Sequence, residues 1–428
     1  MRKGLISVSY FLAFGGLGLV IASLGPIMLA LSEQVEAELN ELAFIFSSRA
    51  TGYLAGSILG GLLVDRVPGH RLLFASLCLT AVATALIPLA TSVGVLAVLT
   101  SMQGLAMGFL DTAGNVLFLW LHGDQNGPWL QAMHCCFAVG AVLSPLFARA
   151  AEDVTGSFHL AFWAFSAILL ATGICFLFLP SPKPPQEPGP AGAAGFLSAL
   201  RRLSSSNVSL LLVVATMLGV YVGSEVAFGG YVLTYSHLRL EFDEAQGQFL
   251  TAVYWGALAG GRFFAIFLSM RMTPRTVLWF DLIGCVLSSA LILVWNASPL
   301  ALWLGSAVFG FSMASIFPTV LSLAESFMPI SGKVASVFII GASMGELSLP
   351  ALVGNVIESH GPQSFPWAIV VFSVISLGML QAVLVAGQRV QRHKLHTAAA
   401  ADPAPRFTTE EESDMSGMLV PTEGSDPA

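Results

Sequence analysis

Long apolar runs that carry almost no charge are the feature that most constrains how this chain can fold. The first extends from residue 5 to residue 31, and similar runs recur along most of the sequence. The hydrocarbon core of a bilayer is about 30 Å thick and takes about 20 apolar residues per helix. Only 10% of the 428 residues are charged, against about 25% in soluble domains. The runs therefore predict membrane-spanning helices.

Twelve such runs predict twelve transmembrane helices. The expected spans are 5–31, 43–64, 72–90, 93–121, 128–148, 158–180, 208–235, 246–269, 276–295, 299–323, 333–357 and 365–387. The first run follows Arg2 and Lys3 but is too long for the apolar part of a signal peptide, and no small-residue cleavage site follows it. We therefore expect it to stay in the protein as the first membrane helix.

Two segments of different composition divide the chain. Residues 181–207 are rich in Pro and Gly and then turn basic, which is typical of a linker. Residues 388–428 are polar and include the acidic stretch TTEEESD, which predicts disorder. The expected organisation is an N-terminal six-helix bundle over 1–180, a cytoplasmic linker, a C-terminal six-helix bundle over 208–387, and a cytoplasmic tail.

The basic residues are distributed unevenly between the predicted loops. Fourteen of the 18 Lys and Arg residues fall on the side of the N-terminus, whereas Arg149 and Arg239 fall on the other side and Arg49 and Arg262 lie within helices. An excess of Lys and Arg marks the cytoplasmic side of a membrane protein. Both termini are therefore predicted to be cytoplasmic. Because no organelle signal is visible, the plasma membrane is the expected location.

Two pairs of short sequences repeat six helices apart. YLAGSILGGLL begins at Tyr53 and YWGALAGGRFF at Tyr254, while FAVGA at Phe137 and FIIGA at Phe338 are each followed by a proline further along. A six-plus-six duplication produces this spacing. The predicted fold class is thus an all-α membrane protein with twelve transmembrane helices in two pseudo-symmetric six-helix bundles. Such bundles surround a midplane cavity in secondary transporters.

Glycines spaced four residues apart recur in two of the predicted helices. Gly56 and Gly60 lie in the second span, and Gly104 and Gly108 lie in the fourth. Small residues at this spacing let membrane helices approach closely. Ordinary helix packing is the simplest interpretation of both pairs.

The loop after the second span carries a recognisable motif. Residues 61–71 read GLLVDRVPGHR, which resembles the signature between the second and third helices of the major facilitator superfamily, with one extra residue before Gly69. The loop between the eighth and ninth spans looks like a degraded second copy. The resemblance implies that a carboxylate and four arginines gate the cytoplasmic ends: Asp65, Arg66, Arg71, Arg271 and Arg275.

Further motifs narrow the resemblance within that superfamily. GFLDTAGNVL at 108–117, with GPWLQAMHCCFAVGA after it and SIFPTVLSLAES in the tenth span, resembles the fucose:proton symporters. With GLVIASLGPIMLAL and GASMGELSLPALVG, the pattern is most similar to the sodium-dependent glucose transporter 1 and major facilitator domain-containing 4 group. The resemblance implies alternating-access transport of a hexose or similar polar solute, coupled to sodium or protons. Fucose symporters carry an acid in the first helix, but the stretch FLAFGGLGLVIASLGPIMLAL of this chain has no ionisable residue.

Asp111 is the strongest candidate for the coupling-ion site. A charge at mid-membrane costs about 2.5–3.5 kcal/mol, so it usually faces a cavity or a partner. Asn115 follows four residues later on the same helix face, and Gln103 extends the stripe. A carboxylate beside an amide can hold a proton or supply oxygens to sodium. The structural alternative is an ion pair with Arg49, and a pair that breaks during transport would combine both roles.

Other polar and aromatic side chains in the spans are candidates for binding the solute. Amide and imidazole groups suit sugar hydroxyls, which both donate and accept hydrogen bonds, and a tryptophan can stack on a sugar ring. The predicted substrate-binding residues are Gln103, Gln131, His134, Tyr221, Glu225, Gln248, Trp255 and Glu346. For each the alternative is a structural partner, and for Glu225 that partner is a basic residue. Arg49 and Arg262 are assigned to the gate, as members of ion pairs.

Several classes of function are not indicated by any motif. No G-x-x-x-x-G-K-[ST] sequence is present, so ATP-driven transport is not expected, and no nucleophile–base pattern predicts an enzyme. We expect a monomer in contact with lipid, with no nucleic-acid partner and no cofactor except a coupling sodium ion or proton. One alternative is a transporter of an organic anion or lipid-like solute, which Arg49 and Arg262 facing the cavity would favour. Another is a non-transporting receptor or scaffold, in which Asp111 and Glu225 would be sealed in ion pairs.

Overall fold

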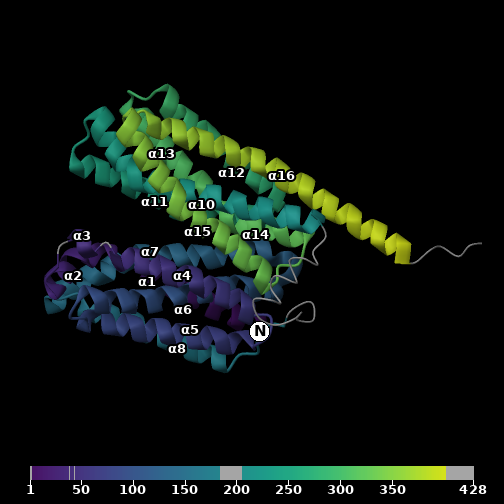
Figure 1. The fold of residues 1–428 in the computed structure, drawn as a ribbon, viewed down its shortest axis with the longest axis horizontal. Helices are drawn as coiled ribbons and strands as arrows, with labels where there is room; N and C mark the ends of the chain where they lie inside the picture. Colours follow the sequence, from purple (N-terminus) through teal and green to yellow (C-terminus); the bar gives the residue numbers. More distant parts are fainter. Residues whose placement is uncertain (1, 38, 43, 184–204, 402–428) are drawn as a thin grey trace, which may run out of the picture.

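The computed structural model of the protein describes residues 2–37, 39–42, 44–183 and 205–401. Long helices lie side by side in two groups, one above the other in Figure 1. The lower group, coloured purple to blue, contains the N-terminal helices. They are α1 (Arg2–Ile21), α4 (Phe44–Leu63), α5 (Gly69–Leu86), α6 (Val93–His122), α7 (Asn126–Thr155) and α8 (His159–Leu177).

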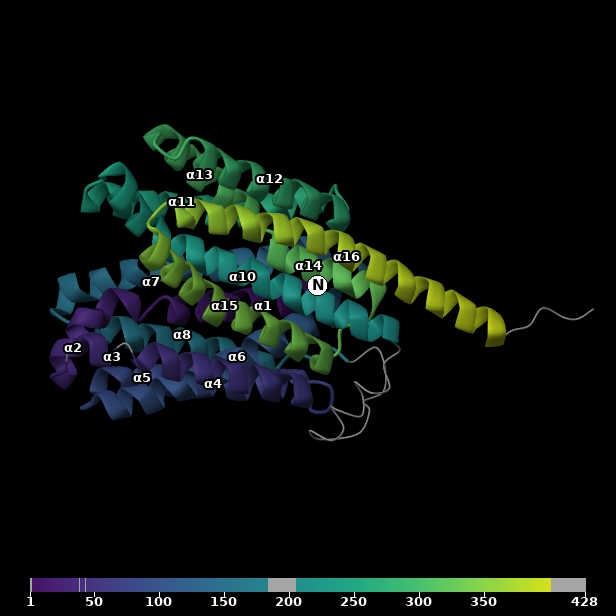
Figure 2. The same cartoon turned by 45° about the horizontal axis from the view of Figure 1, so that its top comes forward.

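The upper group, coloured teal to yellow, contains the C-terminal helices. In Figure 2 the two groups overlap in the middle of the view, with green helices along the upper edge and purple and blue helices along the lower edge. They are α10 (Ser205–Leu240), α11 (Glu244–Ser269), α12 (Pro274–Val294), α13 (Pro299–Met313), α14 (Ile316–Phe327), α15 (Gly332–His360) and α16 (Ser364–Ala401). Short elements connect some of them. These are η1 (Gly25–Ile27), α2 (Met28–Val35), α3 (Leu39–Leu42), η2 (Ile87–Leu89) and η3 (Gly123–Gln125).

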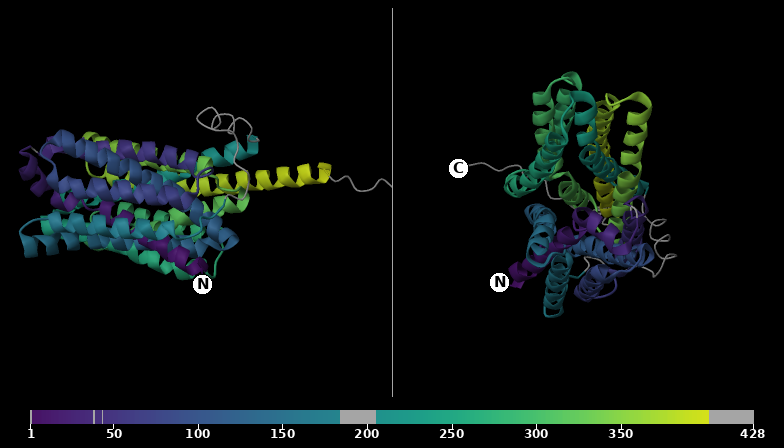
Figure 3. Two further views of the ribbon diagram at one scale, coloured as in Figure 1. Left: turned by 90° about the horizontal axis from the view of Figure 1, so that it is seen from below. Right: turned by 90° about the vertical axis from the view of Figure 1, so that its left-hand side faces the viewer.

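The predicted all-α fold with twelve crossing helices is confirmed. Ten stretches of the described chain are long and apolar enough to cross a membrane, and one of them, Val93–Thr155, contains both α6 and α7. Because α13 and α14 together form one crossing, Pro299–Phe327, the ten stretches hold eleven crossings. The helix α4 supplies the twelfth. Viewed along the helices, the two groups form separate clusters (Figure 3, right). The chain therefore folds as two six-helix bundles.

Several helix boundaries differ from the sequence prediction, and three helices show the main differences. The first crossing ends at Ile21 rather than at residue 31, and the short η1 with its proline follows, because proline lacks the N–H that a continuing helix needs. The tenth crossing is broken between Met313 and Ile316. At the C-terminus, α16 continues to Ala401, past the predicted end at residue 387. Residues 184–204 and 402–428 lie outside the described residues, so the linker and the outer part of the tail stay predictions.

The start of α1 and the end of α16 lie at the same end of the molecule (Figure 1). We call this end the termini side. Here the bundles are joined by hydrogen bonds, as from Trp120 Nε1 to the carbonyl of Ile330 at 3.0 Å and from Ser336 Oγ to the carbonyl of Ser57 at 3.1 Å. Hydrogen bonds of Gln131 and Asp65 to the opposite bundle come from the same half of the helices. Hydrogen bonds therefore join the two bundles on that side.

Close packing of α4 on α6 depends on the predicted glycines. A Cβ atom on Gly104 would overlap the carbonyl of Arg49, and one on Gly108 would overlap the carbonyl of Tyr53. A larger residue at either position would push the two helices apart. The glycines thus bring the side chain of Tyr53 against the next turn of α6, where Asp111 lies.

Candidate transport site

A chain of four polar side chains runs through the N-terminal bundle. Tyr53 Oη donates to Asp111 Oδ2 at 2.7 Å, and Asn115 Nδ2 donates to Asp111 Oδ1 at 3.0 Å. His134 Nε2 lies 3.1 Å from Asn115 Oδ1. Because the Asn115 amide donates to the carboxylate, its oxygen accepts the N–H of His134. We call Tyr53, Asp111, Asn115 and His134 the Asp111 chain; they come from α4, α6 and α7.

Among the described residues, none forms an ion pair with Asp111. Its side chain is buried, with 8% of its surface exposed, and the described ion pairs involve only other carboxylates. The alternative ion pair with Arg49 is not formed, since Arg49 Nη1 donates to the carbonyl of Ile21 at 3.0 Å and the guanidinium lies 5.6 Å from the ring centre of Phe46. Asp111 is thus a carboxylate stabilised by neutral donors, in a place where a proton or small cation would cancel its charge.

The C-terminal bundle holds a second carboxylate in a different setting. Arg262 Nη2 lies 3.7 Å from Glu225 Oε1, and Tyr221 Oη donates to the other carboxylate oxygen. The guanidinium of Arg262 also lies 5.8 Å from the ring centre of Phe137, which belongs to α7 of the other bundle. The predicted alternative for Glu225, a basic structural partner, is therefore what the structure shows. We call Tyr221, Glu225 and Arg262 the Glu225 cluster.

Glu346 of α15 interacts electrostatically with charged residues of both bundles. Its side chain is exposed, and the charges of Arg49 in the opposite bundle and of Glu225 both act on it. Together with Asp111 and Arg262, these residues make three carboxylates and two arginines. This group therefore carries one negative charge in excess when every member is ionised.

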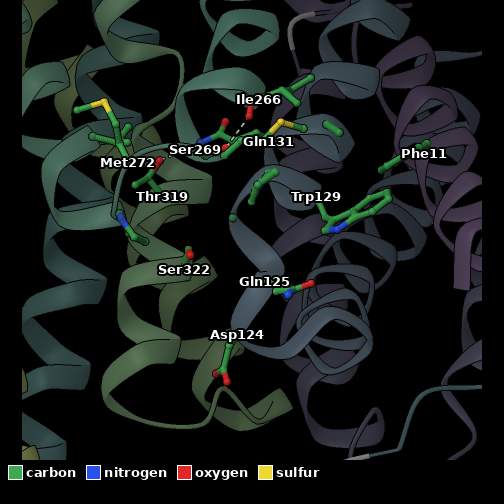
Figure 4. A pocket seen from close by; sticks show the side chains of 16 residues that line it. Phe11, Asp124, Gln125, Trp129, Gln131, Ile266, Ser269, Met272, Thr319 and Ser322 are labelled. Atoms are coloured by element: carbon green, nitrogen blue, oxygen red, sulfur yellow. Dashed lines mark hydrogen bonds between the residues drawn. The ribbon is translucent and has the colours of Figure 1, made fainter.

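Gln131 connects the bundles and borders a cavity. Its Nε2 donates to Thr319 Oγ1 at 2.9 Å and to the carbonyl of Ser315 at 3.3 Å. The cavity has a volume of about 560 Å³ and lies between α7 of one bundle and α11, α12 and α14 of the other. Figure 4 shows Gln131 and Thr319 toward one end and Asp124 toward the other, with Trp129 on the side of the N-terminal bundle. Most of the lining is apolar.

The remaining predicted substrate residues lie apart from these groups. Gln103 is fully buried and donates to Thr84 Oγ1 of α5 at 3.0 Å. Trp255 is 40% exposed and packs against Gly229 of α10. Gln248 is exposed near the start of α11. The structure therefore joins Asp111, Asn115 and His134 in one group, and Tyr221, Glu225 and Arg262 in another, but leaves these three outside.

The predicted gate motif contacts the opposite bundle through Asp65. Its Oδ1 accepts the N–H of Gly332 at 2.8 Å, and Gly332 is the first residue of α15. A carboxylate at a helix N-terminus is stabilised by the helix dipole. Burial raises the pKa of Asp65, while the Gly332 hydrogen bond and the charge of Lys333 act in the opposite direction. Of the predicted gate arginines, Arg66 is half-buried, and three are exposed: Arg71, Arg271 and Arg275.

Sequence reasoning missed two residues that the structure makes prominent. Tyr53 was noticed only as the start of a repeated sequence, yet it donates to Asp111. Asp281 lies inside the ninth predicted span and is 9% exposed, with Ser315 Oγ donating to its carboxylate. The rule that singled out Asp111, a carboxylate within an apolar span, would also have found Asp281.

Comparison with known families and proteins agrees with the fold. The sequence model of the Major Facilitator Superfamily matches residues 6–345. Sodium-dependent glucose transporter 1 of Homo sapiens is 35% identical over 375 residues, which are 80% of this chain and 71% of that protein. Major facilitator superfamily domain-containing protein 4A of Mus musculus is 25% identical over 457 residues, covering 86% of this chain and 89% of that protein.

Solved structures show the same arrangement of helices. A variant of the E. coli fucose:proton symporter FucP superposes with a TM-score of 0.74 at 18% identity, over 91% of this chain and 99% of that chain. The human organic anion transporter MFSD10 superposes with a TM-score of 0.71 at 17% identity, over 90% of this chain and 100% of that chain. At these identities the likeness extends to the fold alone.

Proposed function

The chain belongs to the major facilitator superfamily, and we propose that it moves a hexose or similar neutral polar solute by alternating access. Membership makes it a multi-pass membrane protein of a transporter family rather than an enzyme. A coupling ion, sodium or a proton, would bind at Asp111. With both termini in the cytoplasm, the termini side would form the inner gate.

The uncompensated carboxylate of Asp111 is the observation that carries the coupling role. An unpaired buried charge opposes closure of the bundles, because removing it from water costs several kcal/mol. A proton or a sodium ion cancels that charge and permits the bundles to close over a dry seam. Tyr53 and Asn115 supply the hydroxyl and amide that hold the carboxylate in place. A receptor or scaffold would seal both Asp111 and Glu225 in ion pairs. Glu225 is paired with Arg262, but Asp111 forms no ion pair with a described residue, and this difference favours a transporter.

The arrangement of the arginines supports a neutral solute. Arg262 faces Glu225 at 3.7 Å, and the charge of Arg49 acts on Glu346. Arg262 is therefore not left as an uncompensated positive charge, which an organic anion would require. Relatives named sodium-dependent glucose transporter 1, 35% identical in Homo sapiens and 34% in Xenopus laevis, add weight to a hexose and to sodium.

A lipid-like solute is the second candidate, and the cavity beside Gln131 is the observation that favours it. The cavity of about 560 Å³ is lined largely by apolar side chains, including Phe11, Trp129 and Met270. Such a lining suits an acyl chain or a sterol better than a sugar. Replacing Trp129 by alanine would impair transport of a lipid-like solute through this cavity but leave hexose binding at the Asp111 chain intact.

Uptake into proteoliposomes with imposed sodium or proton gradients tests the proposal. One charge crossing a potential of about 100 mV is worth about 2.3 kcal/mol, enough for roughly 50-fold accumulation of a solute. A panel of sugars, organic anions and lipid analogues identifies the solute, and the two gradients identify the ion. Asp111→Asn should lose accumulation yet still exchange solute across the membrane. Full accumulation by this variant would rule out the coupling role.

A further inference from the structure

We propose that Asp281 is a second proton-binding carboxyl, and that Ser315 links its protonation to the contact between the bundles at Gln131. Asp281 lies in α12 of the C-terminal bundle, on a different helix and in a different bundle from Asp111. Its link to transport rests on the proposed function, whereas its proton binding does not.

Asp281 is a buried carboxylate with a single hydrogen-bond donor. It is 9% exposed, and the donor is the hydroxyl of Ser315. In the described part of the chain, no Lys, Arg or His forms an ion pair with it. At its side, α12 and α13 pack so closely that a Cβ on Gly284 would overlap Ser312 Oγ. Water has little access to solvate the charge, so the neutral acid is the form that this packing favours.

Ionisable groups on the surrounding helices do not compensate Asp281. On α11, Arg262 is occupied by Glu225, and on α14, Glu325 accepts the N–H of Ile330 at 2.6 Å. Cys285 on α12 is near enough to feel the charge of Asp281. The other titratable side chains described on α11, α12 and α16 are Tyr254, Arg275, Arg389, Arg392 and His393, and α13 carries none. Tyr254 Oη donates to the carbonyl of Glu225.

A proton fits this site better than a metal ion. A bound metal ion needs a shell of several oxygen ligands, whereas the one side-chain partner of the Asp281 carboxylate among the described residues is the hydroxyl of Ser315. Protonation forms one O–H bond on the carboxyl, with the proton taken from water and returned to it. The neutral acid can then donate to Ser315 Oγ, so the Ser315 hydroxyl is free to turn toward another acceptor.

Ser315 lies where a change in hydrogen bonding can alter the contact between bundles. It occupies the break between α13 and α14, where the backbone leaves the regular helix. Its carbonyl accepts Gln131 Nε2 of α7 at 3.3 Å and the backbone N–H of Thr319 at 3.0 Å. The same residue therefore contacts Asp281 through its hydroxyl and the opposite bundle through its carbonyl. Protonation of Asp281 is coupled by this residue to closure of the inner gate.

Infrared difference spectroscopy against pH, on the full chain in lipid vesicles, tests the proposal without any transport measurement. The wild-type protein should show a pH-dependent C=O band of a protonated carboxyl that is lost in Asp281→Asn and kept in Asp111→Asn. In Ser315→Ala the band should remain but shift, because its hydrogen-bond partner is gone. Ser288→Ala is the matched control, since Ser288 is a buried serine of α12 that donates only to its own helix.

The link between Asp281 and the contact at Gln131 is tested by the pH midpoint of the Asp281 band. Gln131→Leu should move the pH midpoint of the Asp281 band, because the Ser315 carbonyl loses a donor from the other bundle. A wild-type spectrum without a band that Asp281→Asn removes would overturn the proton site. An unmoved midpoint in Gln131→Leu, with the band present, would overturn the link. Failure of solute accumulation would instead count against the proposed transport function. It would not affect the two infrared tests, the presence of the Asp281 band and its midpoint in Gln131→Leu.

Discussion

The two bundles hold their principal carboxylates in opposite ways. In the N-terminal bundle, Asp111 receives hydrogen bonds from neutral groups, the hydroxyl of Tyr53 and the amide of Asn115. In the C-terminal bundle, Glu225 lies beside the guanidinium of Arg262 as well as a tyrosine hydroxyl. Hydrogen bonds hold a carboxylate in position without cancelling its charge, whereas an arginine cancels it. Of these two carboxylates, Asp111 is the one that still needs a counter-charge, so it is the one suited to couple transport to an ion.

Removing the positive member of the Glu225 cluster should have the largest effect on stability. Arg262→Gln leaves a buried carboxylate uncompensated, which typically costs about 3–5 kcal/mol. The double variant Glu225→Gln with Arg262→Gln should recover most of that loss, because no unpaired charge remains. Thermal unfolding in detergent over the full double-mutant cycle measures both. If Arg262→Gln and the double variant were equally unstable, the ion pair between Arg262 and Glu225 would not be the stabilising feature.

Removing the tyrosine of the Asp111 chain should alter ion binding rather than the fold. Tyr53→Phe deletes a hydrogen bond to a charged group, worth about 1.5–3 kcal/mol. The empty carboxylate loses stability, so the apparent affinity for the coupling ion should rise by about tenfold or more. Ion titration of solute binding measures the change. Tyr221→Phe is the control, and an equal rise there would remove the distinction between the two bundles.

The close contact of α4 and α6 should be needed for the Asp111 chain. Gly108→Ala places a Cβ against the carbonyl of Tyr53, and overpacking of this kind costs about 1–3 kcal/mol. Gly230→Ala in α10 is a matched control, because a Cβ there meets nothing within 4 Å. We expect Gly108→Ala to lower thermal stability and, by weakening the hydrogen bond from Tyr53 to Asp111, to raise ion affinity as Tyr53→Phe does, and Gly230→Ala to change neither. Equal changes in the two variants would show that the close approach has no special role.

The smallest expected effect concerns pH and the gate residue Asp65. Burial raises its pKa in the closed state, so the ionised form is the one that closure disfavours. Closure should weaken as the pH rises from the ordinary carboxyl pKa through the raised value, and strengthen as the pH falls. Spin labels at the exposed positions Val67 and Met270, in a chain with its native cysteines replaced, report the distance between bundles. In Asp65→Asn this pH dependence should vanish, and its persistence would assign it to another group.

Much of the fold follows from the sequence because lipid leaves few choices. Apolar runs in a bilayer must form helices that satisfy their own backbone groups, so the number of crossings could be predicted. The exact ends could not, since Pro26 stops the first helix early and the break at Ser315 has no strong signal. The extension of α16 to Ala401 was missed because its last turns are polar and were assigned to the tail.

The candidate site could be predicted as a set of residues but not as a network. Spacing along one helix placed Asn115 beside Asp111, and the structure shows that contact. Partners from other helices, such as Tyr53 and His134, depend on how the bundle packs, and spacing within one helix says nothing about them. The choice between Arg49 and neutral donors for Asp111 also depended on that packing. Asp281 was overlooked although the same rule applied to it.

Simultaneous measurement of ion and solute uptake in proteoliposomes tests the central claim most directly. The wild-type chain should take up sodium or protons together with the solute in a fixed ratio. Asp111→Asn should take up solute only down its own gradient and with no accompanying ion, while the double variant Glu225→Gln with Arg262→Gln should retain ion uptake. If Asp111→Asn carried the ion with the solute at the wild-type ratio, Asp111 would not be the coupling site.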